Sequence, residues 1–325
     1  MTFHKEQLEQ YESYQGTNPC PADFDTFWEK RKEEADAIPL EYTVTDYAVQ
    51  EHCPTLFQEL HYRGIKGELL YAKYIRPRSD RPVPLILQFH GYPGATRSWM
   101  ELASFAGMGF AVLAVDCPGQ GGFSEDKGGF QGTTVSGHII AGLDGPAEDM
   151  YYVRMHQDSR ILCRIAAQLP EIDEKRIYVN GGSQGGALGL ACTALNPEYV
   201  KKAAILYPFL ADYQKIWEMG ADIIPYEGLR YYTRWFDPKG ERTEEIFTKL
   251  GYIDTMNFAH LVRQEILFGT GLRDVWCLPI TQYGVYNKLQ GKKRHIIFPD
   301  FGHEEIQEFD DMTIPYFCEE AKTWQ

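Results

Sequence analysis

The spacing of apolar residues divides the chain into two parts with different patterns. In the first part, three β-prone runs follow one another, separated by turn signals at Pro54, Gly64 and Gly67: residues 43–49, 56–62 and 68–75. No helical pattern separates these runs. We therefore expect them to form antiparallel strands that open a sheet.

After Pro84, strand patterns alternate with helical patterns. Short apolar runs predict core strands at residues 85–90, 110–116, 176–180, 203–207, 265–269 and 295–299. Helical periodicity covers residues 99–108 and 148–169, and the second of these has one apolar stripe, formed by Ile161, Leu162, Ile165, Ala166 and Leu169. This alternation predicts an α/β fold with a doubly wound, mostly parallel sheet.

Two segments lie outside the alternation. Residues 1–40 favour an N-terminal helical cap, because Phe24, Phe27 and Trp28 are spaced as on one helix face. Residues 209–264 form an insertion rich in aromatic residues, which either bury their rings within the subunit as a lid or pack against another subunit. No repeat, low-complexity tract or linker divides the chain, so we expect residues 1–325 to form a single domain.

The charge of the chain narrows the range of partners. The formal net charge is −14, and the isoelectric point is near 5.1. An acidic chain is a poor ligand for nucleic acid or an anionic membrane, so the sequence favours a neutral or cationic small molecule. No apolar run approaches the roughly 18 residues of a membrane span, and residues 1–9 lack the apolar region of a signal peptide. We expect a soluble, cytoplasmic protein.

The seven cysteines do not suggest a metal site or a disulfide framework. They are odd in number and scattered, and no two of them form a C-x-x-C pair. Cys163 and Cys192 lie in apolar runs and are expected to be buried as small hydrophobic residues. We therefore expect neither a metal nor an organic cofactor.

Residues 181–185 carry the clearest chemical signal. Gly181-Gly-Ser-Gln-Gly185 fits the pattern G-x-S-x-G, the nucleophile elbow between a strand and a helix. Such a tight turn strains the serine backbone, so the residues two before and two after Ser183 must have almost no side chain. The alternative is a glycine-rich turn that only packs tightly. The elbow interpretation therefore needs a histidine, an acid and an oxyanion site elsewhere in the chain.

Chain order selects the partners of Ser183, since the order in this fold is nucleophile, acid, histidine. His303 lies in the loop after the last predicted strand, where ligands of such sheets bind. Asp274 lies in the loop after the preceding strand. Asp300 competes as the acid, but its position three residues before His303 favours a role in bracing that loop.

Two backbone amides are candidates for an oxyanion site. The amide of Gln184 directly follows the nucleophile, and that of Tyr92 lies in the glycine-flanked loop after an early strand. His90 precedes Ser183 in the chain, so we interpret it as structural. The glycine-rich turn at residues 116–122 could line the pocket.

At this point the chain resembles a known family. It is similar to the acetyl xylan esterase / cephalosporin-C deacetylase family of α/β-hydrolases, carbohydrate esterase family 7. The similarity runs nearly end to end and rests on these motifs: Pro21-Ala-Asp-Phe-Asp-Thr-Phe-Trp, His90-Gly-Tyr, Gly181-Gly-Ser-Gln-Gly-Gly-Ala, Gly271-Leu-Arg-Asp-Val-Trp-Cys-Leu-Pro, Tyr286-Asn and Gly302-His-Glu. One motif departs from the family, which usually has Arg-Gly-Gln where this chain has Pro118-Gly-Gln. The sequence leaves the effect of Pro118 on substrate preference open.

The resemblance implies an activity and an assembly. It implies the catalytic residues Ser183, Asp274 and His303, with oxyanion amides at Tyr92 and Gln184. The expected reaction is removal of acetyl groups from acetylated xylo-oligosaccharides, other small acetylated alcohols or cephalosporin C, through an acyl-enzyme and without a cofactor. Family members typically form hexamers, so the resemblance also implies a homo-oligomer. The alternatives are a general carboxylesterase or a serine peptidase on the same fold.

Overall fold

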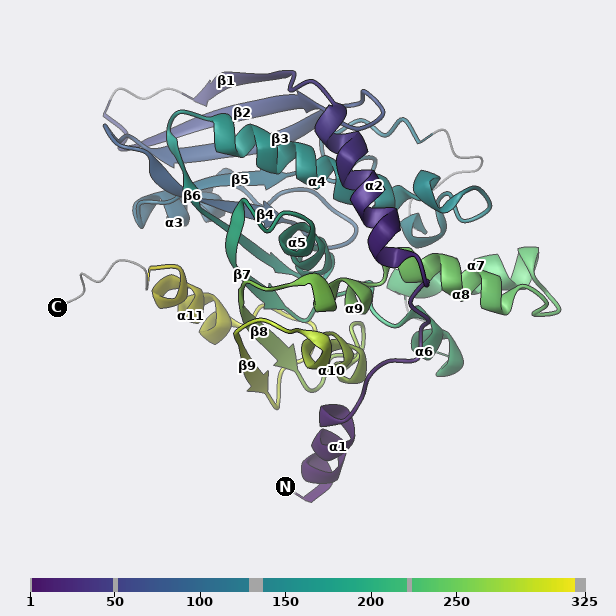
Figure 1. The fold of residues 1–325 in the computed structure, drawn as a ribbon. Helices are drawn as coiled ribbons and strands as arrows, with labels where there is room; N and C mark the ends of the chain where they lie inside the picture. Colours follow the sequence, from purple (N-terminus) through teal and green to yellow (C-terminus); the bar gives the residue numbers. More distant parts are fainter. Residues whose placement is uncertain (1, 49–51, 129–136, 221–223, 319–325) are drawn as a thin grey trace.

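The fold is built on one nine-stranded sheet with helices on both of its faces (Figure 1). The computed structural model describes residues 2–48, 52–128, 137–220 and 224–318. The strand order across the sheet is β1-β2-β3-β5-β4-β6-β7-β8-β9. The strands are β1 (Tyr42–Ala48), β2 (Thr55–Arg63), β3 (Leu69–Pro77), β4 (Val83–Phe89), β5 (Ala111–Val115), β6 (Ile172–Gly182), β7 (Val200–Leu206), β8 (Glu265–Gly271) and β9 (Lys293–Phe298).

The pairing directions follow the two sequence patterns. β1, β2 and β3 pair antiparallel, and β3 pairs antiparallel with β5. Every other neighbouring pair is parallel, from β5-β4 to β8-β9. The predicted α/β fold with antiparallel N-terminal strands and a mostly parallel sheet is therefore confirmed.

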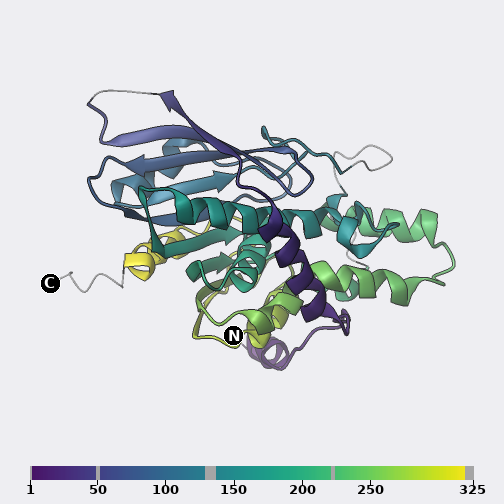
Figure 2. The same cartoon turned by 45° about the horizontal axis from the view of Figure 1, so that its top comes forward.

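The helices cover the sheet in two layers. α3 and α11 pack on one face, while α4, α5 and α10 pack on the other, and α2 lies over α4 (Figures 1 and 2). The helices are α1 (Thr2–Glu12), α2 (Phe24–Ala37), α3 (Trp99–Gly107), α4 (Tyr151–Gln168), α5 (Gln184–Leu195), α6 (Tyr213–Glu218), α7 (Glu227–Phe236), α8 (Thr243–Leu250), α9 (Thr255–Phe258), α10 (Pro279–Lys288) and α11 (Gln307–Cys318). Among the described residues, none of these helices has the length and apolarity needed to cross a membrane.

The aromatic residues between β7 and β8 differ in exposure, and Tyr252 is half-buried. Seven are buried within the subunit: Tyr207, Phe209, Tyr213, Tyr226, Tyr232, Phe247 and Phe258. Four are exposed, and three of these lie on α7: Trp217, Tyr231, Trp235 and Phe236. Both figures show α7 and α8 extending away from the sheet. Burial within the subunit thus accounts for only part of the aromatic content of this insertion.

A buried carboxylate ties the N-terminal segment to the loop after β7. Asp212 accepts hydrogen bonds from the Tyr14 hydroxyl at 2.5 Å and from the backbone amides of Thr17 at 3.0 Å and Asn18 at 2.9 Å. The backbone amide of Asp212 in turn donates to Asp254 at 2.9 Å. Burial, reinforced by the charge of Asp212, raises the pKa of Asp254 to about 8. Residues far apart in the chain therefore shape this loop together.

Two glycines allow α5 to begin against the sheet. A Cβ on Gly181 would lie 2.2 Å from the carbonyl oxygen of Gly185, and a Cβ on Gly185 would lie 2.1 Å from the carbonyl oxygen of Phe89. Both contacts are to backbone atoms, which cannot rotate away. The close approach of β4, β6 and α5 therefore requires glycine at both positions.

We predict that Gly185→Ala destabilises the fold by about 1–3 kcal/mol or more, because the methyl group overpacks against the backbone of β4. Gly107→Ala is the matched control, because no atom lies within 4 Å of its Cβ position. The control should unfold at the unmodified urea concentration or slightly above it. Equal urea midpoints for Gly185→Ala and the unmodified chain would contradict the prediction.

Candidate active site

Ser183 stands between the end of β6 and the start of α5, in a strained backbone conformation. Its φ of 57° and ψ of −124° lie where side chains are rarely found. Its amide donates to the carbonyl of Leu206 at 3.0 Å, and its carbonyl accepts from Phe209 at 3.0 Å. Hydrogen bonds from β7 and its following loop thus hold the serine in place. This is the geometry expected of a nucleophile elbow.

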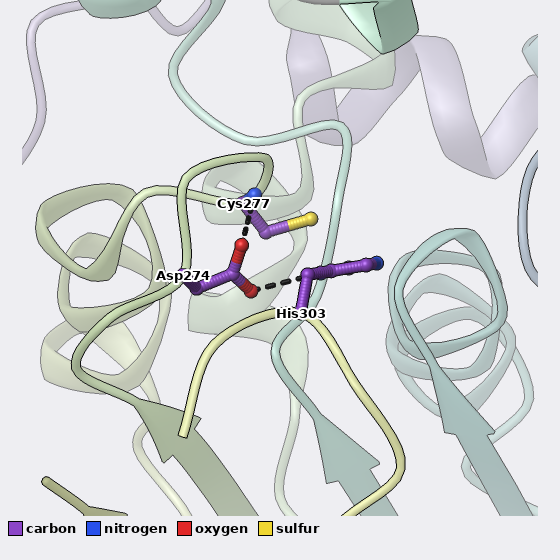
Figure 3. A group of neighbouring side chains, drawn as sticks. All are labelled: Asp274, Cys277 and His303. Carbon is purple, nitrogen blue, oxygen red and sulfur yellow. Dashed lines mark hydrogen bonds and ion pairs between the residues drawn. The ribbon is translucent and has the colours of Figure 1, made fainter. Parts of the chain in front are cut away.

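The loops after β8 and β9 bring Asp274 and His303 together (Figure 3). His303 Nδ1 lies 2.8 Å from Asp274 Oδ2, and the Asp274 side chain is fully buried. Its other oxygen, Oδ1, accepts the amides of Trp276 and Cys277, each at 2.8 Å. A carboxylate fixed by these donors accepts the proton on His303 Nδ1. The opposite ring nitrogen, Nε2, is then the acceptor of the imidazole.

Aromatic neighbours fix the plane of the His303 ring. The ring centroid of Tyr207 lies 4.6 Å from that of His303, and the ring centroid of Trp276 lies at 5.2 Å. The Tyr207 hydroxyl donates to the carbonyl of Glu304 at 2.9 Å, which also anchors the loop. Such support holds the imidazole in one orientation.

Among the hydrogen bonds of the described residues, none joins Ser183 to His303. Both residues line one cavity. Ser183 Oγ instead lies 4.0 Å from Cys277 Sγ. A serine hydroxyl reorients by rotation about one bond, and catalytic hydrogen bonds are often long before substrate binds.

Asp300, the competing acid, lies at the surface. Its carboxylate forms an ion pair of 2.7 Å with Arg273, and the two side chains are 78% and 63% exposed. The hydrogen bond to His303 comes from Asp274. The geometry therefore favours Asp274 as the partner of the histidine.

The two candidate oxyanion residues flank the serine. Gln184 opens α5, so its amide belongs to the first turn, whose N–H groups have no partner within the helix. Tyr92 lines the same cavity as Ser183, and its hydroxyl accepts from the Gly137 amide at 2.9 Å and contacts His138 Nδ1 at 3.0 Å. Burial raises the pKa of the Tyr92 hydroxyl, so it stays protonated at neutral pH.

The side chain of Gln184 is fully buried in a hydrogen-bond network. It forms a reciprocal pair with Gln120, in which each amide group donates to the other's oxygen, at 2.8 and 2.9 Å. The hydroxyl of Tyr152 also donates to Gln184 Oε1 at 2.8 Å. Gln120 follows Pro118, whose carbonyl accepts from the Tyr151 hydroxyl at 2.8 Å. The turn at residues 116–122 thus braces the residue after the nucleophile.

His90 holds the loop that carries Tyr92. Its Nε2 accepts from the Cys117 amide at 2.9 Å, so Nδ1 carries the proton and donates to the Gly91 carbonyl at 2.7 Å. Burial lowers the pKa of His90, which keeps the ring neutral. Both nitrogens are engaged, in agreement with a structural role.

Asp274, Cys277 and His303 also have to be considered as metal ligands. One ligand atom from each lies within 4.8 Å of the others. The Asp274 oxygens, however, already accept hydrogen bonds from amides and from the imidazole. Burial, with Asp274 close by, raises the pKa of the Cys277 thiol well above its ordinary value, whereas a metal binds the thiolate. The donor set fits a hydrogen-bonded pair better than a metal site.

A cleft of about 650 Å³ opens beside Ser183 and His303. It runs between α3 and α11 over the ends of β4, β6 and β7. Its size is typical of small-molecule sites. The Cys277 side chain, whose sulfur lies 4.0 Å from Ser183 Oγ, is buried and does not line this cleft.

Three features of the site were not predicted from the sequence. The pairing of Gln120 with Gln184 and the position of Cys277 beside Ser183 had no local signal. Gln88 and Asn180, which line the cleft, did have one, because each is a polar residue that directly follows an apolar run near the end of its strand.

A family model, a curated relative and two solved structures point to one family. The family model described as acetyl xylan esterase (AXE1) matches residues 1–320. The structure of acetyl xylan esterase 1 from Thermoanaerobacterium sp. JW/SL YS485 superposes with a TM-score of 0.93 at 38% identity, covering 97% of this chain and 99% of that one. The acetyl xylan esterase from Paenibacillus sp. R4 gives 0.90 at 28% identity, covering 96% and 99%.

A curated relative is similar over a smaller share of its own length. The chain is 27% identical to acetyl esterase Axe7A of Xylanibacter ruminicola over 290 residues, which are 86% of this chain. The matched region spans 62% of that relative. The relative is therefore considerably longer than the part that this chain matches.

We predict that Gln120→Leu lowers the free energy of unfolding by about 1–3 kcal/mol, because it leaves the buried Gln184 carboxamide without two of its hydrogen bonds. Gln184→Leu should destabilise by a similar amount. The double variant should lose less than the sum of the two, since neither partner is then left unpaired. Urea unfolding of the four proteins measures the coupling, and additive losses would argue against it.

Proposed function

Because the chain belongs to the acetyl xylan esterase (AXE1) family, we propose that it is a serine esterase that removes acetyl groups from acetylated xylo-oligosaccharides or other small acetylated alcohols. The observation that carries this proposal is the 2.8 Å contact between Asp274 and His303 in the cavity that also holds Ser183. The single strained serine, the imidazole and the buried carboxylate come from three separate loops at one edge of the sheet.

The proposed reaction proceeds in two steps. His303, oriented by Asp274, takes the proton from Ser183 Oγ as this oxygen attacks the ester carbonyl. The alcohol leaves with a proton from His303, and the acetyl group stays on Ser183. Water then attacks this acyl-enzyme with His303 again as the base, and acetate is released.

The amides of Tyr92 and Gln184 are proposed to stabilise the oxyanion of each tetrahedral intermediate. One such donor is worth about 3–4 kcal/mol in comparable enzymes. The Gln184 amide also lies at the positive end of the α5 dipole, which favours negative charge at this place. The buried network around Gln120 supports this role by fixing the start of α5.

The alternatives, a general carboxylesterase or a serine peptidase, differ in the acyl group. We propose that the acetyl methyl lies on the side closed by Cys277, whose sulfur is 4.0 Å from the nucleophile. The packing of Phe209 against Tyr92, with ring centroids 6.0 Å apart, supports a small acyl pocket. Cephalosporin C remains a proposed substrate, since its acetyl group would fit this pocket equally well.

Assembly and location are further proposals. The exposed rings of Tyr231, Trp235 and Phe236 on α7 support a contact with another subunit, so we propose a homo-oligomer, hexameric by resemblance. All seven cysteines are free thiols, which supports a reducing compartment such as the cytoplasm. We also propose that residues 1–325 form a single domain, which includes the N-terminal segment 1–40 and the insertion 209–264.

We predict that Ser183→Ala and His303→Ala reduce hydrolysis of p-nitrophenyl acetate to near background, because the two residues act as one unit. Asp274→Asn should reduce kcat on the order of several-thousand-fold, as the imidazole loses its orientation and electrostatic support. Rates measured at pH 7.5 under saturating substrate provide the comparison.

The control for the acid is Asp300→Asn. An exposed ion pair such as Arg273–Asp300 contributes little, so kcat should stay within about twofold of the unmodified value. A larger loss for Asp300→Asn than for Asp274→Asn would transfer the acid role to Asp300.

We predict that acetyl esters are hydrolysed at least about tenfold faster than butyryl esters, since overpacking a small pocket costs about 1–3 kcal/mol. The kcat/KM values of p-nitrophenyl acetate, butyrate and octanoate measure this preference, and the leaving group is the same in all three. Equal values for acetate and octanoate would favour a general carboxylesterase.

A further inference from the structure

Two carboxamides lie side by side on the sheet face that α3 and α11 cover. Gln88 on β4 and Asn180 on β6 are register partners, so their side chains lie next to each other on one face. Both are half-buried, and both line the cleft between α3 and α11. In the part of the chain that the structure describes, neither carboxamide makes a side-chain hydrogen bond. Two amide groups are thus available to a ligand in the cleft.

The neighbours of this pair leave room for a ligand. In the same register, Gln88 is followed across the sheet by Ala114 on β5, and Asn180 by Ala204 on β7. Their small side chains keep the floor of the cleft open. The walls are partly apolar, with Phe105 from α3 and Phe309 and Ile314 from α11. Amide groups beside apolar and aromatic walls suit a molecule that carries both hydroxyl groups and C–H faces.

The cleft is continuous with the nucleophile. Ser183 and His303 line it together with Gln88 and Asn180. Asn180 lies three residues before Ser183, which is at most about 10 Å along the chain and within reach of a sugar of one or two rings. Cys277 is buried next to Ser183 and is not part of the cleft lining, so an ester whose acetyl group lies toward Cys277, as proposed above, extends its alcohol into the cleft.

The charges at the mouth of the cleft favour a neutral ligand. Asp310 and Asp311 on α11 and Glu101 on α3 line this end, together with Arg97. Arg97 lies 3.7 Å from Glu101 and 3.5 Å from Glu305, so acidic groups surround its charge. Burial raises the pKa of Asp310, and Lys73 donates to the backbone carbonyl of Arg97 at 2.6 Å, so this end of the cleft carries charges of both signs. A charged alcohol gains little net attraction there, whereas hydroxyl groups find both donors and acceptors.

We propose that the cleft between α3 and α11 is the binding site for the alcohol part of the ester, a neutral sugar whose hydroxyl groups hydrogen-bond to the Gln88 and Asn180 carboxamides. This inference rests on the proposed esterase function and specifies its substrate class. It assigns to Gln88 and Asn180 a role in selecting the alcohol, separate from the chemistry at Ser183.

The test compares three acetyl esters that differ only in the alcohol: xylose tetraacetate, 1-naphthyl acetate and p-nitrophenyl acetate. The variants Gln88→Met and Asn180→Leu keep side-chain size and remove the amide. For each variant, kcat/KM for xylose tetraacetate should fall about tenfold, mainly through a higher KM, as expected for a lost hydrogen bond. Both aromatic esters should stay within about twofold, because their alcohols do not use the amides.

Two further variants complete the design. Gln290→Met makes the same chemical change at an exposed glutamine outside the cleft and should leave all three rates unchanged. Ser104→Trp places a large ring at the exposed rim of the cleft, without altering the sheet. It should slow xylose tetraacetate and spare p-nitrophenyl acetate.

The outcomes separate this inference from the proposed function. Selective loss of sugar-ester hydrolysis in Gln88→Met and Asn180→Leu supports the sugar site. Equal losses on all three esters would overturn it, since both residues would then act through packing. Unchanged rates on all three esters would overturn it as well. The esterase proposal fails on a different result, namely full activity of Ser183→Ala.

Discussion

The site depends on the close packing of the α5 backbone against the backbones of β4 and β6. The strands β4 and β6 meet the helix with no space for a side chain at Gly181 or Gly185. This contact forces Ser183 into its positive φ and turns the first amides of the helix toward the cavity edge. The strain is held by hydrogen bonds from β7 and by the buried carboxamide pair of Gln184 and Gln120. The rest of the sheet serves as the rigid support for this one turn.

The surroundings of Ser183 toward the loop after β8 differ from those toward α3 and α11. The loop after β8 brings the Cys277 sulfur within 4.0 Å of Ser183 and buries the Asp274 carboxylate. Toward α3 and α11 the structure leaves a cleft with an amide-lined floor. The proposed selection of the acyl group and the proposed selection of the alcohol therefore depend on different loops and helices.

Much of this arrangement could be predicted from the sequence, because local patterns determine it. Apolar periodicity located the strands to within a few residues, and the glycines around Ser183 marked the turn. Chain order pointed to Asp274 and His303, which the structure joins by a hydrogen bond. The contact of Ser183 with Cys277, the Gln120–Gln184 pair and the register of Gln88 with Asn180 could not be predicted. They depend on how separate elements pack, and no spacing in the chain encodes that packing.

The hydrogen bond between Asp212 and Tyr14 affects how the protein can fold while it is being synthesised. Tyr14 lies 198 positions before Asp212, and Trp28 donates to a carbonyl still later in the chain, at Tyr252. At the usual pace of synthesis, roughly 10–40 s pass between the emergence of Tyr14 and that of Asp212. During this interval Trp28 can already pack against His156 of α4, but Tyr14 lacks Asp212 and Trp28 lacks the later residues Tyr252 and Phe258. The N-terminal segment therefore completes its native contacts only after translation has passed the nucleophile.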